Sequence, residues 1–184
     1  MLYNELKSGT DIRGVASDLG GKAVNLTDEA VYDITNAFVV WYCNKFLCDS
    51  ANLRIAVGRD SRITGERIAN KVCEALVNSG VIVYNCSMAS TPAMFMTTVD
   101  MKTDAAIQIT ASHHPFDRNG LKFFIPSGGL NGSDISEIIE LANNCESVIT
   151  DLKGFVVPVD YMSGYAARLR RMICNATDKT EADK

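Results

Sequence analysis

Residues 105–125 read AAIQITASHHPFDRNGLKFFI, and this stretch decides the fold that we predict for the chain. An apolar, strand-like run at 105–109 leads into small and polar residues, and Gly120 opens a second such run at 121–125. Residues 117–120 have the composition of a turn, because an Asn-Gly pair tolerates positive φ. We therefore predict that the two runs return on each other.

This return would gather reactive side chains at the end of the first run. It would bring the amine of Lys122 back toward the hydroxyl of Ser112, beside the imidazoles of His113 and His114. The residue types alone leave two interpretations of this polar loop open, a functional site and an ordinary turn.

A second loop near the N-terminus carries similar chemistry. Residues 8–14 read SGTDIRG, so that glycines bracket Thr10, Asp11 and Arg13. Small residues let the backbone approach a ligand closely, and a guanidinium group suits a pair of anionic oxygens. The same letters also describe a tight turn with a surface arginine.

A third polar loop, GRDSR at residues 58–62, follows a short apolar run at 53–57 that we interpret as a buried strand. It places Arg59 and Asp60 at a strand end, where open α/β sheets bind their ligands. The alternative is that these two side chains simply pair with each other in a solvated turn.

Helical patterns alternate with the strand-like runs. One predicted helix starts at a Thr27 cap, another at a Ser90 cap, and a later one at a capping box formed by Asp134 and Glu137. The alternation predicts an α/β domain over residues 1–150. We expect a layered domain with a mixed β-sheet between helices, since the hairpin-like return adds antiparallel pairing.

The pattern changes beyond this domain. We predict a linker over residues 151–159 and then, over residues 160–184, the start of a truncated second domain with a polar tail. Its helix has an apolar face that little further sequence is present to cover. This face can fold back on the first domain, pair with a second copy of the chain or melt, and we expect it to pack against a second copy through residues 160–174. The face comprises Tyr161, Tyr165, Leu169, Met172 and Ile173.

Composition restricts the partners. The 184 residues carry a net charge of −4, so we expect neither nucleic acid nor a membrane as partner, but a small molecule. The six cysteines lack metal-ligand spacing, and we predict that they are free and reduced. No secretory signal or membrane-length apolar run occurs, which favours a cytoplasmic protein.

Several rival chemistries fail on spacing. A serine hydrolase needs a base that is separated in sequence from its nucleophile, but the two histidines of the chain directly follow Ser112. Those histidines and Asp117 offer too few ligands for a closed zinc site. Neither a G-x-G-x-x-G motif nor a P-loop is present, which argues against nucleotide binding by those devices.

The three polar loops together resemble the α-D-phosphohexomutases, the phosphoglucomutase and phosphomannomutase family. The shared letters are Thr-Ala-Ser-His with a following Pro, Asn-Gly and Lys at residues 110–122, Gly-Thr-Asp-x-Arg-Gly at 9–14 and Gly-Arg-Asp-x-Arg at 58–62. The resemblance covers the first domain and a little of the second. It implies a mixed sheet between helical layers, in agreement with the pattern.

The resemblance also implies roles for individual residues. Ser112 would be phosphorylated and would exchange its phosphoryl group with a sugar phosphate. Lys122 and His113 would position or protonate that group, and Arg13 would balance its charge. A different residue, His114, stands where the family has Asn. The secondary site residues would be Thr10, Asp11, Arg59, Asp60, His114 and Asn119.

Magnesium follows from the same resemblance, since two phosphates that approach each other need a cation between them. Ser112 would bind Mg²⁺ through its phosphate, and the other ligands would come from an Asp-Gly-Asp-x-Asp-Arg loop that is not found before Lys184. We expect hexose phosphate and hexose bisphosphate as partners, and little turnover by this part alone. The alternative is a non-catalytic phosphosugar-binding or interaction module on the same fold.

Overall fold

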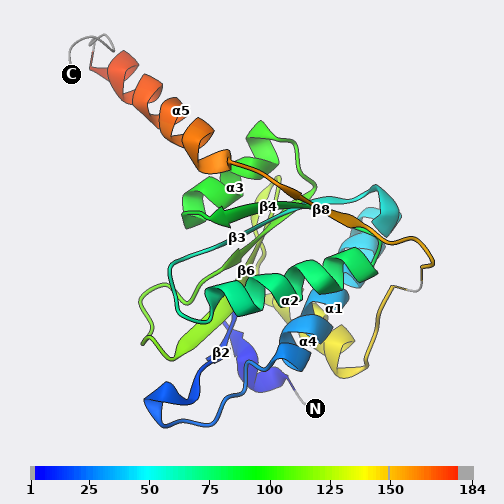
Figure 1. Cartoon of the computed structure of the whole chain (residues 1–184). Coiled ribbons are helices and arrows are strands. Elements are labelled where there is room, and N and C mark those ends of the chain that lie inside the picture. Colours follow the sequence, from blue (N-terminus) through cyan, green and yellow to red (C-terminus); the bar gives the residue numbers. More distant parts are fainter. Residues whose placement is uncertain (1–2, 149, 178–184) are drawn as a thin grey trace.

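The computed structural model describes residues 3–148 and 150–177, which form a layered α/β structure around a mixed sheet (Figure 1). The strand order is β1-β2-β6-β5-β3-β4-β8, and β7 pairs with β6. The strands are β1 (Lys7–Ser8), β2 (Asp11–Val15), β3 (Arg54–Arg59), β4 (Ile82–Met88), β5 (Ala105–Ile109), β6 (Arg118–Ile125), β7 (Gly128–Gly129) and β8 (Phe155–Pro158). The helices are α1 (Asp28–Phe46), α2 (Gly65–Asn78), α3 (Thr91–Asp100), α4 (Gly132–Asn143) and α5 (Tyr161–Ala176).

The sheet is mixed and lies between helices, which confirms the predicted fold class. β3, β4, β5 and β8 pair in parallel, whereas β2 pairs antiparallel with β6, and β6 with β5. Alternate side chains of a strand point to opposite faces. Ile107 and Phe123 therefore join the core cluster that contains residues of α1, α2 and α4, while Ala106 and Phe124 join the smaller cluster beside α3 (Figure 1).

The two strand-like runs do return on each other, but the turn lies elsewhere than predicted. β5 and β6 pair antiparallel, with Gln108 opposite Lys122. Asn119 and Gly120 lie inside β6 and are buried, so the prediction of a turn is wrong for residues 118–120; Asp117 does lie in a turn, which ends before β6. The polar residues that precede β6 make the connection instead.

Gly120 is required for close packing and not for positive φ. A Cβ atom at this position would lie 2.1 Å from the carbonyl oxygen of Ile12 and 3.0 Å from Cγ of Arg13, both on the neighbouring strand β2. Real Cβ atoms do not approach backbone oxygens so closely. The glycine therefore lets β2 and β6 pair while the Arg13 side chain crosses above residue 120.

Helix caps agree with the sequence at one helix and differ at another. Thr27 caps α1 as predicted. The cap of α4 is Asn131, whose side chain forms a capping box with Asp134, so the helix begins earlier than the predicted box of Asp134 and Glu137. Glu137 instead accepts a hydrogen bond of 2.8 Å from Nε1 of Trp41 and holds α4 against α1.

Part of the predicted linker belongs to the sheet. Within residues 151–159, β8 pairs in parallel with β4 at the sheet edge. Pro158 lies at the end of this edge strand, opposite Asn85, a position where its missing N–H group costs no ladder bond. The domain boundaries at 150 and 160 themselves stay a prediction, and residues 178–184 of the predicted tail lie outside the described residues.

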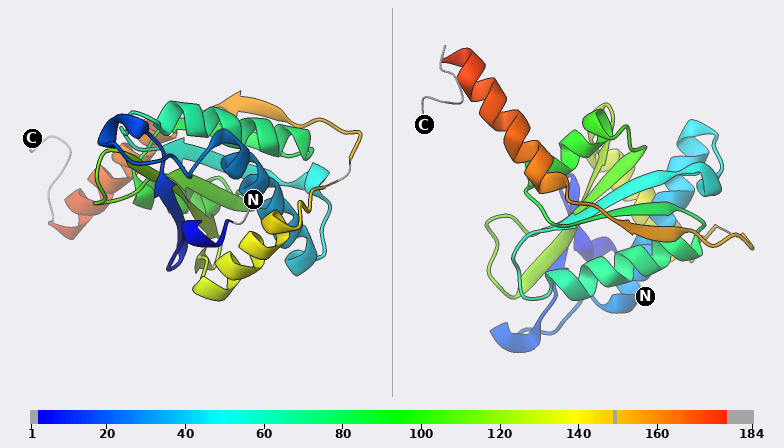
Figure 2. Two further views of the ribbon diagram at one scale, coloured as in Figure 1. Left: turned by 90° about the horizontal axis from the view of Figure 1, so that it is seen from below. Right: turned by 45° about the horizontal axis from the view of Figure 1, so that its top comes forward.

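Helix α5 follows β8 and projects away from the layered body (Figure 2). Its N-terminal end is anchored, because Tyr161 is buried and its hydroxyl donates a hydrogen bond of 2.8 Å to Asp100 at the end of α3. Further along, Leu169, Met172 and Ile173 are 40%, 55% and 63% exposed. The start of the helix, with Tyr161 and Tyr165, thus packs on the first domain, whereas its later residues do not, and pairing with a second copy stays a prediction.

The described residues also bear on the cysteines and on membranes. All six cysteines are free, as predicted. Burial raises the pKa of Cys73 and of Cys86 to about 11, so both thiols stay protonated and behave as small apolar groups. None of the helices that the structure describes is long and apolar enough to cross a membrane.

Candidate active site

Asp11, Arg13 and Lys122 form a charged cluster on neighbouring strands. Nζ of Lys122 lies 2.6 Å from Oδ1 of Asp11, and Nη2 of Arg13 lies 2.6 Å from Oδ2. One carboxylate therefore binds two cations, which leaves the cluster with a net positive charge. Asp11 is only 6% exposed, and the low dielectric of a buried position strengthens these contacts.

Arg13 retains a donor that the protein does not use. Its Nη1 atom is buried and makes no hydrogen bond to any described residue. A buried donor without a partner is costly, and an anionic oxygen would satisfy it. Gly120 lies opposite Arg13 in the sheet register and offers no side chain that could do so. The cluster is therefore suited to bind an anion.

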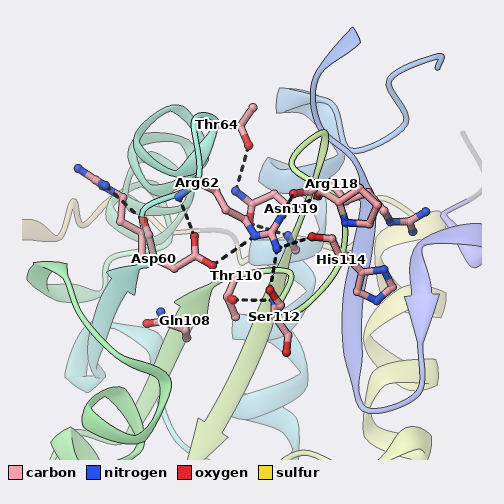
Figure 3. A network of polar contacts seen from close by, with 12 residues as sticks. Asp60, Arg62, Thr64, Gln108, Thr110, Ser112, His114, Arg118 and Asn119 are labelled. Carbon is pink, nitrogen blue, oxygen red and sulfur yellow. Dashed lines mark hydrogen bonds and ion pairs between the residues drawn. The ribbon is translucent and has the colours of Figure 1, made fainter. Parts of the chain in front are cut away.

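Ser112 lies in the loop between β5 and β6, which begins where the N–H group of Thr110 donates to the carbonyl oxygen of Gly120, the residue opposite Arg13. Its side chain is exposed, and its backbone has φ of 54°, a left-handed conformation that is unfavourable for residues other than glycine. The N–H group of Ser112 donates a hydrogen bond of 2.9 Å to Oγ1 of Thr110, which is visible in Figure 3. Such conformations persist only where surrounding contacts enforce them, and they concentrate at functional sites.

The two histidines of the loop stack on each other. The ring centroids of His113 and His114 are 5.0 Å apart with an interplanar angle of 18°. Burial and then the positive charge of Arg13 lower the pKa of His114, with further contributions from Arg118, His113 and Arg62. Arg13 thus lies close enough to the loop for its charge to act on His114.

In the Gly-Arg-Asp-x-Arg loop, the side chains of Arg59 and Asp60 do not form the ion pair that the solvated-turn alternative requires. The Asp60 carboxylate faces Arg62, with Oδ2 3.4 Å from Nε, while Arg59 is 3.7 Å from Glu66. Arg62 reaches across to the Ser112 loop and donates hydrogen bonds to three of its carbonyl oxygens and to that of Arg118 at the start of β6 (Figure 3).

Two of the predicted secondary site residues, Asn119 and Thr10, lie outside the charged cluster of Asp11, Arg13 and Lys122. Asn119 is fully buried, and its amide donates a hydrogen bond of 3.0 Å to Oγ1 of Thr64, so it ties β6 to the start of α2. Thr10 is exposed in the turn between β1 and β2, beside Asp11. The structure thus brings Asp11, Arg13 and Lys122 into direct contact and joins Asp60 to the loop through Arg62.

Two polar residues of the site have no role in the sequence-based prediction. Arg62 is the second arginine of the motif at residues 58–62, and the motif alone does not indicate which residues Arg62 contacts. Gln108 is fully buried in β5; its Nε2 donates a hydrogen bond of 2.9 Å to the carbonyl of Ala89, and its Oε1 has no partner among the described residues. The sequence signal that could have identified Gln108 is the single amide side chain inside the apolar run AAIQI.

Comparison with known proteins identifies the family. The model of the family described as "Phosphoglucomutase/phosphomannomutase, alpha/beta/alpha domain I" matches residues 6–148. The chain belongs to this family. It is 32% identical over 155 residues to the phosphoglucomutase of Neisseria gonorrhoeae, an alignment that covers 84% of this chain and 31% of that protein. It is 34% identical over 133 residues to the phosphoglucosamine mutase of Arthrobacter sp. (strain FB24), covering 72% and 28%.

A solved structure of the same phosphohexomutase family has the same fold. The crystal structure of a phosphoglucomutase/phosphomannomutase family protein from Burkholderia thailandensis superimposes with a TM-score of 0.75 at 22% identity. The match covers 91% of this chain and 36% of that one. The chain therefore spans about a third of the length of the relatives that it matches.

Proposed function

We propose that this chain is the N-terminal, serine-bearing domain of a phosphohexomutase, which interconverts hexose 1-phosphate and hexose 6-phosphate through a hexose bisphosphate. Family membership supports an isomerase of phosphosugars. The observation that carries the proposal is the unused, buried donor of Arg13, which lies beside Lys122 and next to the loop that exposes Ser112.

The proposed reaction uses phosphorylated Ser112 as the phosphoryl donor. The Oγ–P bond breaks and a bond forms between phosphorus and a sugar hydroxyl oxygen, which loses its proton. Oγ takes up a proton, so the step moves one proton from the sugar hydroxyl to Oγ, with Lys122 and His113 as the proposed donors to Oγ, recharged by the proton of the hydroxyl. The reverse transfer from the other end of the bisphosphate restores the phosphoserine and releases the product. Arg13 stabilises negative charge on the phosphoryl oxygens throughout.

Mg²⁺ is the proposed cofactor, and it would neutralise charge between the attacking and leaving oxygens. On this chain the phosphate of Ser112 is the proposed ligand, because the Asp11 carboxylate already binds Arg13 and Lys122. Within residues 3–148 and 150–177, no group of three or more His, Cys, Asp or Glu side chains is placed to bind a metal ion. The remaining ligands would have to come from outside these residues.

The proposal names a class of substrate. The two relatives are named for glucose and glucosamine phosphates, so the hexose itself is left open. The polar contacts described above concern the phosphoryl group, and they do not select among sugars.

Phosphate transfer to Ser112 tests the proposal. The complete natural protein that contains this chain is incubated with glucose 1,6-bisphosphate and Mg²⁺, and peptide mass spectrometry locates the phosphate. We expect a single phosphoserine at position 112 and none in the Ser112→Ala variant. Phosphate at another residue would overturn the assignment of the carrier. Bound bisphosphate without any protein phosphorylation would favour a phosphosugar-binding module.

A further inference from the structure

Arg62 lies between β3 and α2 with its side chain directed into the Ser112 loop (Figure 3). Its Nη1 atom donates hydrogen bonds to the carbonyl oxygens of Pro115, at 2.7 Å, and Arg118, at 2.9 Å. Its Nη2 atom donates to the carbonyl oxygens of Ser112 and His114, each at 2.7 Å. One guanidinium group thus holds three carbonyls of the Ser112 loop and that of Arg118, the first residue of β6.

The four terminal donors of Arg62 are used within the protein. A guanidinium group has five N–H donors. Four of them meet backbone carbonyls, and Nε faces the carboxylate of Asp60 at 3.4 Å. The four Nη donors are therefore not available to a phosphoryl group or a sugar, and Nε is directed at Asp60. In this respect Arg62 differs from Arg13, whose Nη1 has no partner among the described residues.

The contacts of Arg62 fix the backbone on one side of Ser112, and Thr110 fixes the other. Arg62 donates a hydrogen bond to the carbonyl oxygen of Ser112, and the N–H group of Ser112 donates one to Oγ1 of Thr110. Together they enforce the left-handed conformation at φ of 54°, which a serine would otherwise avoid. The direction of the Cα–Cβ bond, and hence the place of Oγ, follows from this backbone conformation.

The same contacts orient two amides of the loop. The described chain has no cis peptide bond, so the C=O and N–H groups of one peptide unit point in opposite directions. Because the carbonyls of Ser112 and Pro115 point toward Arg62, the N–H groups of His113 and Phe116 point away from it. Neither N–H group has a hydrogen-bond partner in the parts of the chain that the structure describes. Both are free to meet an anion.

We propose that Arg62 is a positioning residue, which presents Ser112 and the amides of His113 and Phe116 to the phosphoryl group without touching that group itself. Its role at a phosphoryl group rests on the function proposed above. Its control of the loop backbone does not.

The first measurement concerns the loop without any phosphate. Hydrogen–deuterium exchange is followed in this chain for the amides of Ser112, His114 and Arg118, which are hydrogen-bonded within the loop. In Arg62→Lys the positive charge stays but the planar fork is lost. We expect these amides to exchange about tenfold faster or more, with unchanged exchange in the core strands, because the loop alone is released.

A matched control uses another arginine that holds a backbone carbonyl. Arg67 on α2 pairs with Asp28, and its Nη2 donates a hydrogen bond of 3.0 Å to the carbonyl of Ala16. Arg67→Lys should leave exchange in the Ser112 loop unchanged. Should Arg62→Lys fail to fold, Asp60→Asn serves in its place, because it loosens the anchor of the guanidinium while the arginine stays. We expect faster loop exchange there too.

The second measurement reads the phosphoryl group itself. Phosphoserine is incorporated at position 112 of this chain, and ³¹P NMR follows its second ionisation, ordinarily near pH ~6. In the wild type, Arg13, Lys122 and the free amides should lower this pKa, since all of them favour the dianion. Arg62→Lys should raise the pKa toward the value of a free peptide, although the charge at position 62 is kept.

The outcomes separate the possible roles. Unchanged loop exchange in Arg62→Lys would overturn the proposal outright. Faster exchange with an unchanged phosphoserine pKa would show a purely structural contact, which also contradicts it. If the phosphoserine pKa stays lowered in Arg62→Lys but returns to the free-peptide value in Arg62→Gln, the charge of residue 62 matters and its hydrogen bonds to the loop do not, which contradicts the proposal. None of these readouts needs transfer from a sugar, so they stand apart from the labelling of Ser112 by the bisphosphate.

Discussion

Arg13 and Arg62 differ in how many of their donors are free. Arg13 keeps a buried Nη1 without a partner among the described residues, while Arg62 donates to four carbonyls and faces Asp60. The sequence offers the same residue type at both positions. Only the count of satisfied donors assigns anion binding to one and loop geometry to the other.

Replacement of Lys122 by alanine should affect chemistry more than folding. We expect kcat of the complete enzyme to fall by ~100-fold or more, the scale of a lost acid or charge-stabilising group. Stability should fall by at most about 1 kcal/mol, because the Asp11 carboxylate keeps Arg13 as its partner. Steady-state kinetics and thermal melting measure the two effects.

The matched control for this variant is Lys45→Ala. Lys45 also lies 2.6 Å from a buried carboxylate, that of Asp134, but it is on α1 and not among the proposed site residues. Its loss should cost similar stability and leave kcat unchanged. Equal losses of activity in both variants would contradict a specific role for Lys122.

The ring of His114 should titrate below the ordinary histidine value. Burial and the charge of Arg13 disfavour the imidazolium in the folded loop, so its pKa is lowered there. The unfolded chain then binds a proton more readily. The stabilising contribution is therefore present above pH ~6.5 and is lost as pH falls through the folded pKa.

Proton NMR of the two histidine rings measures this titration, with Arg13→Gln and Arg54→Gln as variants. Arg13→Gln should raise the pKa of His114. Arg54→Gln should not, because Arg54 lies at the start of β3, at the other end of the strand from the loop that holds Arg62. A His114 ring that titrates above its unfolded value would show that the charged cluster does not act on the loop.

At the scale of elements, the pairing of β2 with β6 depends on the absence of a side chain at Gly120. An added Cβ would lie 2.1 Å from the carbonyl oxygen of Ile12, a backbone atom that cannot rotate away. Gly120→Ala should therefore destabilise the chain by about 3 kcal/mol or more, through overpacking and a shifted strand. Urea denaturation measures the change in the free energy of unfolding.

Gly164→Ala provides the comparison, because it is the same substitution inside α5, where no atom lies within 4 Å of the added Cβ. Alanine in an exposed helix interior should stabilise by roughly 0.5–1 kcal/mol or leave stability unchanged. If Gly120→Ala unfolds at the same urea concentration as the wild type, the close approach of the two strands is wrong.

At the scale of the whole molecule, α5 presents an uncovered apolar face. Leu169, Met172 and Ile173 are 40–63% exposed, and full burial of such a side chain stabilises by roughly 1.5–3 kcal/mol. We therefore expect two copies of this chain to associate through residues 160–174 in solution. The anchored Tyr161 should take little part, because it is already buried against the first domain.

Sedimentation velocity tests this association. The wild-type chain should sediment as a dimer at micromolar concentration, and the double variant Met172→Glu, Ile173→Glu as a monomer. Ala167→Glu adds the same kind of charge to the other side of α5 and should leave the dimer intact. A monomeric wild type with an ordered α5 would contradict the prediction.

Local patterns in the sequence determined the classes of element and most of their starts. The apolar period and the caps at Thr27 and Ser90 depend on contacts within one turn of helix, so the sequence contains all that is needed. Alternating strands and helices then indicated the layered α/β fold. The three polar loops also indicated which side chains to examine.

Tertiary structure decided what depends on contacts between distant segments. The turn moved from Asn119-Gly120 to the Ser112 loop because Gly120 is needed against β2, more than 100 positions away along the chain. The partners of Asp11 and Arg62, and the place of β8 in the sheet, are likewise set by sheet register and close packing. Such contacts leave no local period in the sequence, since each is fixed only when the whole core has packed.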